Sequence, residues 1–303
     1  MTVGETKDFT CLNCGDSAHQ RIYRGKIRSG EHGHFTKDEQ SVFACEGCGL
    51  ARLEVFEADL AYYESEAYRE DYNADVSAKG YLDAHAAEQP PRLDRIGSSA
   101  FENKTVLDFG CGGGAFLDLV KPYAQVTIGI EPFSGFHASL RSRGHQVFGG
   151  DAEALKEWHG KVDVMVSFGV IEHTEDPAGY LTAAMNLLRP GGVLYIETDN
   201  LDDILMKAGV PEFEQFFYRT AHLWYFTGDT LAKLCRKIGF QDIAVGHRHN
   251  FDVSNTMMWL RDGRPTGYGA LPLFDDLADQ SWKDMIERLG YADLIHAKVV
   301  KPS

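Results

Sequence analysis

One stretch near the middle of the chain limits the possible folds more than any other. Residues 105–114 read Thr-Val-Leu-Asp-Phe-Gly-Cys-Gly-Gly-Gly. Val106, Leu107 and Phe109 predict a short, buried strand of a parallel sheet. The glycines predict a sharp turn whose backbone lies against a ligand, because a Cβ would obstruct both. A helix expected from Ala115 would aim its N-terminal N–H groups at that ligand. The stretch therefore predicts an α/β fold that binds a flat, polar, adenosine-like ligand.

Two acids near this turn indicate the charge of the ligand. The spacing Gly110-x-Gly112-x-x-Ala115 also fits the loose dinucleotide pattern, so the glycines alone do not exclude a nicotinamide cofactor. Asp108 lies just before the glycines, where a carboxylate would repel a pyrophosphate but suits an ammonium group, such as that of S-adenosylmethionine. Glu131 ends the next predicted strand, about 20 residues further on, where an acid binds ribose hydroxyls.

Three more motifs follow in order along the chain. Asp151 follows a glycine pair and is suited to bond an adenine amino group. Residues 162–168 predict a fourth strand that leads into Gly-Val-Ile-Glu-His at 169–173. Residues 187–196 predict a helix end, a turn and a fifth strand.

This ordered series of five motifs resembles the class I S-adenosylmethionine-dependent methyltransferases, over roughly residues 100–250. The resemblance implies a doubly wound, mostly parallel seven-stranded sheet of the Rossmann-like kind, with the cofactor across the carboxyl ends of its first strands. It also implies a cofactor site lined by residues at these strand ends and by one tyrosine before them: Asp108, Gly110, Gly112, Gly114, Glu131, Pro132, Asp151, Ala152, Ser167, Phe168 and Tyr72.

The cysteines predict a metal site near the N-terminus. Cys11 and Cys14 form one Cys-x-x-Cys-Gly turn, and Cys45 and Cys48 form another about 30 residues later, a spacing typical of a zinc ribbon. No export signal is visible at the start of the chain, so we expect a cytoplasmic protein with reduced thiols. Four thiolates close the coordination sphere, which predicts a structural Zn²⁺ and no Lewis-acid role.

Composition narrows the class of partner. The chain has 303 residues, of which 44% are hydrophobic, enough to bury at least one full core. No apolar run is long enough to span a bilayer. The formal net charge of −15 disfavours a phosphate-backbone partner. We therefore expect a small-molecule substrate, with a sugar or nucleotide-sugar among the candidates, and neither nucleic acid nor membrane as partner.

The motifs also suggest a division of the chain. Residues 1–55 are predicted as the zinc ribbon, and residues 56–100 as an acidic, tyrosine-rich helical segment over the cofactor site. Residues 101–303 are predicted as the methyltransferase domain. Within that domain, residues 198–222 are predicted as a substrate-loop insertion, and residues 251–290 as a lid or an elaborated crossover.

Two histidines are candidates for the proton-transfer chemistry. Methyl transfer from a sulfonium has a good leaving group, so the enzyme mainly aligns the reactants in a dry site. A hydroxyl nucleophile also needs a base, and imidazole is suited to this near neutral pH. His173 follows the fourth predicted strand and His222 ends the insertion. We predict His222 as the base and His173 as base or substrate-positioning group; a core or capping role is the alternative for each.

A second resemblance concerns the substrate. The zinc module, Glu172-His173 and the loop ending in His222 are similar to sugar C-methyltransferases that act on nucleotide-linked keto-sugars. Those enzymes carry a Tyr-x-Glu-His run where this chain has residues 219–222, Arg-Thr-Ala-His, so the acid is replaced by Ala221. This departure favours methyl transfer to a hydroxyl of a small metabolite, sugar or carrier-linked intermediate. C-methylation of a keto-sugar remains the alternative.

A metal-dependent reaction, a non-catalytic binding protein and an oxidoreductase are the alternatives to a metal-independent methyltransferase. Some ubiquinone-pathway and RNA-end methyltransferases bind magnesium with a Glu-x-x-Glu-His run at the position of residues 169–173. Here Gly169 takes the place of the first acid. Glu172, His173 and His222 could still form an incomplete magnesium site, but it would be short of oxygen ligands, so a metal-independent reaction is expected. A non-catalytic S-adenosylmethionine-binding module would bind the cofactor without turnover. A nicotinamide oxidoreductase would bind NAD instead.

Overall fold

A computed structural model describes residues 9–31, 33–56, 60–71, 77–265 and 271–303, with the side chain of Tyr68 excepted. The chain divides into two compact units. Unit 1 comprises Met1–Glu57, Glu197–Leu234 and Ala244–Ala297. Unit 2 comprises Ala58–Ile196, Cys235–Ile243 and Lys298–Ser303. The predicted insertion and the predicted lid segment thus group with the N-terminal cysteine region.

A parallel sheet forms the centre of unit 2. Its strands are β4 (Thr105–Phe109), β5 (Val126–Ile130), β6 (Gln146–Phe148) and β7 (Val162–Phe168). Strand β4 pairs in parallel with both β5 and β7, so that Leu107 lies opposite Ile128 and Met165. All three side chains are fully buried, as expected for strands covered on both faces.

Three further strands complete this sheet and contribute residues to both units. They are β8 (Leu188–Asp199), β10 (Gln241–Arg248) and β11 (Leu294–Val300). Within the described residues the strand order is β10-β11-β8-β7-β4-β5-β6. The order reverses beside β4, which is where doubly wound sheets bind their ligands. The predicted α/β fold, with a seven-stranded, mostly parallel sheet, is confirmed.

The start of β8 differs from the prediction. The run Arg-Pro-Gly-Gly at 189–192 predicted a turn, but the strand begins at Leu188, directly after helix α8 (Pro177–Leu187). Gly191 N donates to Lys301 O, and Lys301 N donates to Gly192 O. These hydrogen bonds join the glycine pair to a segment more than 100 residues away, which local sequence does not specify, while Gly191 keeps a left-handed φ of 69°.

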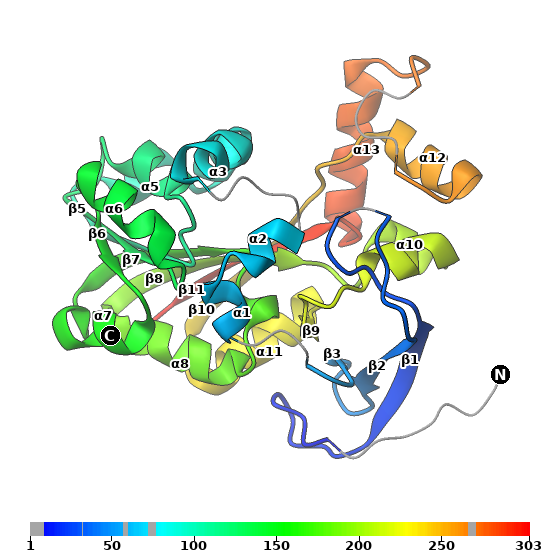
Figure 1. Ribbon diagram of the computed structural model, residues 1–303, viewed down its shortest axis with the longest axis horizontal. Coiled ribbons are helices and arrows are strands. Elements are labelled where there is room, and N and C mark those ends of the chain that lie inside the picture. The colour runs from blue at the N-terminus through cyan, green and yellow to red at the C-terminus, as the bar shows by residue number, and fades with distance from the viewer. Residues whose placement is uncertain (1–8, 32, 57–59, 72–76, 266–270) are drawn as a thin grey trace. The chain divides into compact units, whose positions relative to one another are not determined.

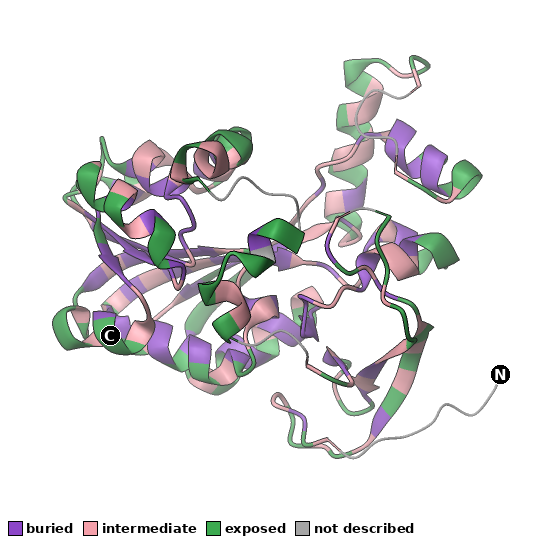
Figure 2. Cartoon of the chain, viewed as in Figure 1, coloured by how far each residue is buried: buried purple, intermediate pink, exposed green. Residues whose placement is uncertain are grey.

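Helices cover both faces of the sheet in unit 2. Helices α5 (Ala115–Val120) and α6 (His137–Ser142) lie on one face, and α7 (Asp151–Trp158) and α8 lie on the other (Figure 1). Figure 2 shows that burial is concentrated in the strands between them. The described part of the predicted segment 56–100 contains the helices α1 (Leu60–Glu64), α2 (Ala67–Asp71), α3 (Ala78–His85) and α4 (Gln89–Ile96).

Unit 1 is built on a second sheet, of order β1-β2-β3-β9. The first three strands are β1 (His19–Gly25), β2 (Gln40–Cys45) and β3 (Ala51–Leu53), and the fourth is β9 (Trp224–Tyr225). Each neighbouring pair is antiparallel, and Ala51 lies opposite Tyr225. The sheet that begins in the cysteine region is therefore completed by a strand that directly follows the predicted insertion.

The helices of unit 1 supply much of its core. They are α9 (Ile204–Lys207), α10 (Pro211–Phe217), α12 (Val253–Asp262) and α13 (Asp276–Leu289), while α11 (Gly228–Ile238) runs on into unit 2. Asp252 and Asp275 begin α12 and α13 by accepting hydrogen bonds from the backbone N–H groups of Asn255 and Ala278. Trp259 of α12 packs against Phe213, with ring centroids 5.1 Å apart.

Through Trp259, the described part of the segment predicted as a lid or an elaborated crossover shares in the core of unit 1. Its role as either stays a prediction. Among the helices that the structure describes, none is both long enough and apolar enough to cross a membrane.

Candidate functional site

The glycine-rich turn between β4 and α5 has the backbone geometry that its sequence predicts. Gly110, Gly112 and Gly114 have φ angles of 84°, 52° and 85°, in the left-handed region that side chains disfavour. A Cβ on Gly110 would lie 2.5 Å from Val170 Cγ2, and one on Gly112 would lie 2.7 Å from Tyr81 Cε1. Both backbone conformation and close packing therefore require glycine here.

Asp108 is a buried acid at the end of β4, with 4% of its surface exposed. Among the described residues, none donates a hydrogen bond to its carboxyl group. Burial raises the pKa of Asp108 to about 7; Arg92 opposes this rise and Glu131 adds to it. A carboxylate in such surroundings gains from a cationic ligand, which fits the ammonium group that the sequence predicts.

Glu131 follows β5 and is also buried. Its Oε1 accepts hydrogen bonds from Phe133 N (2.8 Å) and Arg69 Nη2 (3.1 Å), and its Oε2 accepts one from Gly112 N (2.9 Å). Burial raises the pKa of Glu131, while the Phe133 N–H, Arg69 and the Gly112 N–H oppose the rise. The acid thus joins the end of β5 to the glycine turn.

Arg69 was not predicted as a site residue. Its side chain is 4% exposed, and its guanidinium lies over the rings of Phe133 (4.0 Å) and Phe136 (4.7 Å). The sequence offers one indication of its role, which is that Arg69 is a basic residue within the acidic, tyrosine-rich segment. Its partner, Glu131, lies 62 residues further along the chain.

The remaining predicted cofactor residues differ in their surroundings. Ser167 is fully buried at the end of β7, and its Oγ shares a hydrogen bond with Tyr180 Oη. Phe168 packs edge-on against Phe116, with centroids 5.0 Å apart. Asp151 begins α7. Pro132 and Asp151 are half-buried, whereas Ala152 is exposed. Tyr72 lies outside the described residues.

The sheet register brings several of these residues to one edge. Asp108 lies level with Gly129 of β5 and with Val166 of β7. Glu131 and Ser167 therefore lie at the carboxyl ends of the strands on either side of Asp108. These are the residues that the sequence predicted, at the edge where α/β sheets bind ligands.

His173 lies in unit 2, in the short 3-10 turn Ile171–His173 that follows β7. Its Nδ1 is 3.1 Å from the hydroxyl of Tyr63, and the two rings meet edge to face with centroids 5.4 Å apart. Tyr63 comes from α1, so a tyrosine of the predicted helical segment contacts a predicted site residue. Glu172, the preceding residue, is buried.

His222 lies in unit 1, just before β9, with 3% of its surface exposed. Its Nδ1 is 3.2 Å from Asp199 Oδ2. The same oxygen accepts a hydrogen bond of 2.5 Å from Arg219 Nη2. Neither Asp199 nor Arg219 was predicted. The available signals were an acid at the end of a strand and an arginine in the run 219–222.

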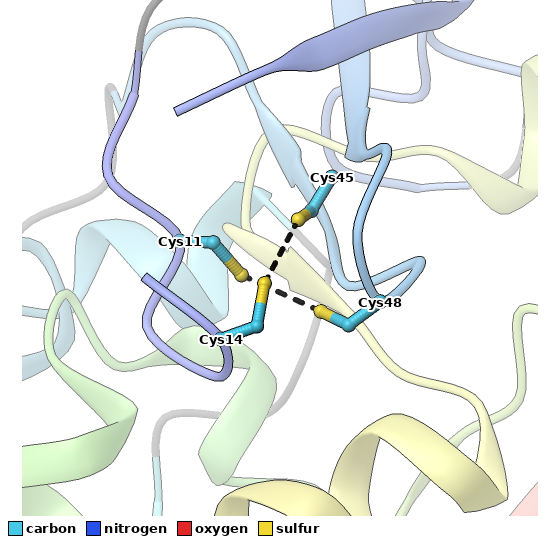
Figure 3. Close-up of side chains that lie close together, drawn as sticks. All are labelled: Cys11, Cys14, Cys45 and Cys48. Atoms are coloured by element: carbon cyan, nitrogen blue, oxygen red, sulfur yellow. Dashed lines mark hydrogen bonds between the residues drawn. The ribbon is translucent and has the colours of Figure 1, made fainter. Parts of the chain in front are cut away.

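The four predicted metal-binding cysteines come together in unit 1, with their sulfur atoms innermost (Figure 3). The Sγ atoms of Cys11 and Cys48 are 3.5 Å apart and those of Cys14 and Cys45 are 3.4 Å apart. All four lie within 4.8 Å of one another. A tetrahedron with zinc–sulfur bonds of about 2.3 Å has sulfurs about 3.8 Å apart, so the donor set fits Zn²⁺.

The two cysteine turns share one backbone geometry. Gly15 N donates to Cys11 O, and Gly49 N donates to Cys45 O. Gly15 and Gly49 have left-handed φ angles of 78° and 83°. Each glycine closes its Cys-x-x-Cys turn at equivalent positions, which is the role that the repeated Cys-x-x-Cys-Gly pattern predicts.

Comparisons with known proteins agree with this geometry. Residues 82–245, more than half of the chain, match a family model described as a methyltransferase domain. The chain is 30% identical over 154 residues to a ubiquinone biosynthesis O-methyltransferase of Cereibacter sphaeroides, covering 47% of this chain and 62% of that protein. It is 29% identical over 170 residues to a protein of the same name from Ruegeria pomeroyi, covering 52% and 67%.

The chain thus spans less than two thirds of the length of the first of these relatives. Its fold is similar to the crystal structure of an S-adenosylmethionine-dependent methyltransferase from Archaeoglobus fulgidus, with a TM-score of 0.51 and 17% identity. That likeness covers 77% of this chain and 98% of the other.

Proposed function

Because this chain belongs to the methyltransferase-domain family, we propose that it transfers a methyl group from S-adenosylmethionine to a hydroxyl of a small metabolite, sugar or carrier-linked intermediate. The observation that carries the proposal is Asp108, a buried carboxyl group to which no described residue donates a hydrogen bond. A nucleotide cofactor without a cationic group would leave this acid uncompensated.

The cofactor is held, in this proposal, by residues at the carboxyl edge of the parallel sheet. Asp108 binds the ammonium group, and the glycine turn allows the backbone to approach the ligand closely. Glu131 binds the ribose hydroxyls through the acceptor capacity that its three described hydrogen bonds leave. Asp151 bonds the adenine amino group. The cofactor supplies an electrophilic methyl group on a positively charged sulfur.

Proton transfer falls to histidine in this proposal. The acceptor oxygen forms a bond to the methyl carbon, the sulfur–methyl bond breaks with its electron pair on sulfur, and the hydroxyl proton goes to His222. The support for His222 is that its imidazole is buried and is suited to accept a proton near neutral pH. His173, next to the Tyr63 hydroxyl, positions the acceptor or serves as a second base.

Transfer to oxygen is preferred to transfer to carbon. The relatives from Cereibacter sphaeroides and Ruegeria pomeroyi are named as O-methyltransferases. Ala221 is 1% exposed and takes the position of an acid in the sugar C-methyltransferases that the sequence resembles. This chain would offer a keto-sugar acceptor no acid at that position. C-methylation of a nucleotide-linked sugar is therefore the alternative and not the preferred reaction.

The four cysteines are assigned a structural role. The spacing of their sulfur atoms supports a bound Zn²⁺ held by Cys11, Cys14, Cys45 and Cys48, as in a zinc ribbon. Four protein ligands leave no open position, so this metal takes no part in the transfer. The reaction itself is proposed to be metal-independent.

Calorimetry and turnover test the proposal together. We expect the protein to bind S-adenosylmethionine and to form S-adenosylhomocysteine with 3,4-dihydroxybenzoate or with a pool of hydroxylated extract metabolites. His222→Ala should lower the transfer rate at least tenfold while leaving cofactor affinity within twofold, because the base acts only on the acceptor. His159→Ala, at an exposed histidine, is the control and should change neither.

Three outcomes would count against parts of the proposal. Absence of any heat of binding with S-adenosylmethionine would overturn it entirely. Tight binding without turnover on either acceptor would support the non-catalytic module instead. An unchanged rate in His222→Ala would remove this histidine from the mechanism.

A further inference from the structure

The end of strand β8 carries an acid that the proposed reaction has not yet used. Asp199 is the last residue of β8, and the carboxyl ends of strands in such sheets face the ligand. Its side chain is half-buried, with 23% exposure. The sheet fixes the position of Asp199, because this residue ends a strand. Its two partners, Arg219 and His222, come from the chain that follows β8.

Two cationic or ionisable side chains share one oxygen of this acid. Arg219 Nη2 donates to Asp199 Oδ2 at 2.5 Å. His222 Nδ1 lies 3.2 Å from the same atom, an ion-pair contact that lacks the geometry of a hydrogen bond. Burial alone would raise the pKa of the Asp199 carboxyl, but Arg219 and His222 hold it well below its usual range. The acid is therefore a carboxylate at neutral pH, able to accept hydrogen bonds but not to donate one.

The loop that carries these partners is fixed by its own backbone. The Tyr225 hydroxyl accepts a hydrogen bond from Arg219 N (3.1 Å) and donates one to Arg219 O (3.2 Å). His222 N also donates to Arg219 O (3.1 Å). Thr220 N donates to Arg28 O, which connects the loop to the segment that follows β1. The arginine and the histidine thus approach Asp199 from a loop with little freedom to rearrange.

An acceptor-only neighbour decides the tautomer of an imidazole. With a carboxylate beside Nδ1, the stable neutral form carries its proton on Nδ1 and has its basic lone pair on Nε2. If His222 becomes an imidazolium by accepting a proton, the carboxylate also stabilises that charge. Arg219 partly neutralises the carboxylate, which limits this stabilisation and keeps the imidazolium able to release its proton.

We propose that Asp199 is a positioning residue for the reaction: it holds His222 as the Nδ1–H tautomer with Nε2 as proton acceptor, and Arg219 holds Asp199 in place. This inference rests on the proposed role of His222 as base. It goes beyond that role because it assigns functions to two residues that neither the sequence motifs nor the family resemblance pointed to. A purely structural Asp199–Arg219 ion pair is the competing explanation.

Nuclear magnetic resonance of the ring nitrogens tests the tautomer without any substrate. The full-length protein, labelled with ¹⁵N-histidine, is compared with Asp199→Asn, and the His222 signals are assigned by their loss in His222→Gln. We expect the wild-type ring to carry its proton on Nδ1. In Asp199→Asn we expect that preference to be lost, because an amide can donate as well as accept.

Kinetics with 3,4-dihydroxybenzoate supply the second readout. Asp199→Asn should lower kcat at least tenfold, with KM and the cofactor dissociation constant within twofold, while Asp199→Glu should retain more activity than Asp199→Asn. Asp163→Asn is the matched control. It removes another partly buried carboxylate–arginine pair, Arg189 Nε to Asp163 Oδ1 at 2.5 Å, at the start of β7. We expect that control to leave both the His222 tautomer and kcat unchanged.

The outcomes separate this inference from the proposed function. A wild-type His222 with its proton on Nε2 would overturn the inference, whether or not this acceptor is turned over. An equal loss of kcat in Asp199→Asn and Asp163→Asn would show a purely structural ion pair and overturn it too. If His222→Ala keeps full activity, the failure lies in the proposed base. If His222→Ala is inactive and Asp199→Asn is fully active, the inference alone fails.

Discussion

At the scale of single residues, unit 2 contains two buried acids beside its glycine turn. Asp108 and Glu131 lie at the carboxyl ends of neighbouring strands, and burial raises the pKa of both. The two acids differ in the hydrogen bonds that offset the cost of burying their carboxyl groups. Glu131 accepts hydrogen bonds from Arg69 and two backbone N–H groups. Asp108 receives none from any described residue, so its ionisation depends on what binds beside it.

The raised pKa of Asp108 predicts a pH dependence of cofactor binding. The folded protein without ligand holds this proton up to about pH 7, whereas the unfolded chain releases it near the ordinary value of 3.8. The proton therefore favours the folded state at low pH, and that contribution to stability is lost as the pH rises through about 7. Because the ammonium group requires the ionised acid, affinity for S-adenosylmethionine should rise about tenfold between pH 5.5 and 7.

Isothermal titration calorimetry in buffers of different ionisation enthalpy measures both the affinity and the proton released. Asp108→Asn should bind more weakly at pH 7 and lose the trend with pH. Asp83→Asn, at an exposed acid on α3, should retain that trend. An unchanged trend in Asp108→Asn would assign the pH dependence to another group.

At the scale of elements, α2 shows how a short helix is anchored by a buried side chain. This five-residue helix is too short to be stable alone. Arg69, in its middle, is 4% exposed and pairs with Glu131 while lying over two phenylalanine rings. The helix therefore depends on its contact with the core of unit 2 more than on its own hydrogen bonds.

Removing this buried partner should cost far more than removing an exposed one. Arg69→Met leaves Glu131 buried without its counter-ion, so we expect a loss of about 3 kcal/mol in the free energy of unfolding. Arg24→Met breaks the ion pair with Glu39, in which both side chains are more than half exposed, and should cost under about 1 kcal/mol. Urea unfolding of both variants measures the difference; equal losses would show that Arg69 does not anchor α2.

At the scale of the whole molecule, the cysteine region is connected to the candidate base through one sheet. Cys45 ends β2, and β3 pairs with β9, which begins two residues after His222. Arg52 of β3 lies over the ring of Trp224, at 5.3 Å. We therefore expect the proposed zinc to support the sheet that holds the His222 loop.

Metal analysis and amide hydrogen exchange test this connection. The purified protein should contain about one zinc per chain, and Cys14→Ser should lose it together with exchange protection at residues 224–226, because an open cysteine site loosens the sheet. Cys235→Ala, at a buried cysteine of α11, should keep the zinc. A zinc-free wild-type protein, or unchanged protection in Cys14→Ser, would contradict the proposal.

The sequence by itself determined the parts of this protein that depend on short stretches of chain. The strand at 105–109, the glycine turn and the two cysteine turns could all be predicted, because hydrophobic pattern, glycine conformation and ligand spacing act within a few residues. Asp108 and Glu131 were predicted for the same reason: each follows from its position at a strand end.

Only the tertiary structure decided which distant residues meet. The pairing of Arg69 with Glu131, the contact of Asp199 with His222 and the addition of β9 to β3 join residues between 20 and more than 100 positions apart. No local pattern marks such a partner, since a buried arginine or aspartate looks in sequence like any solvated charge. The role of such a buried charge is decided by the tertiary fold, which brings opposite charges together where water is excluded.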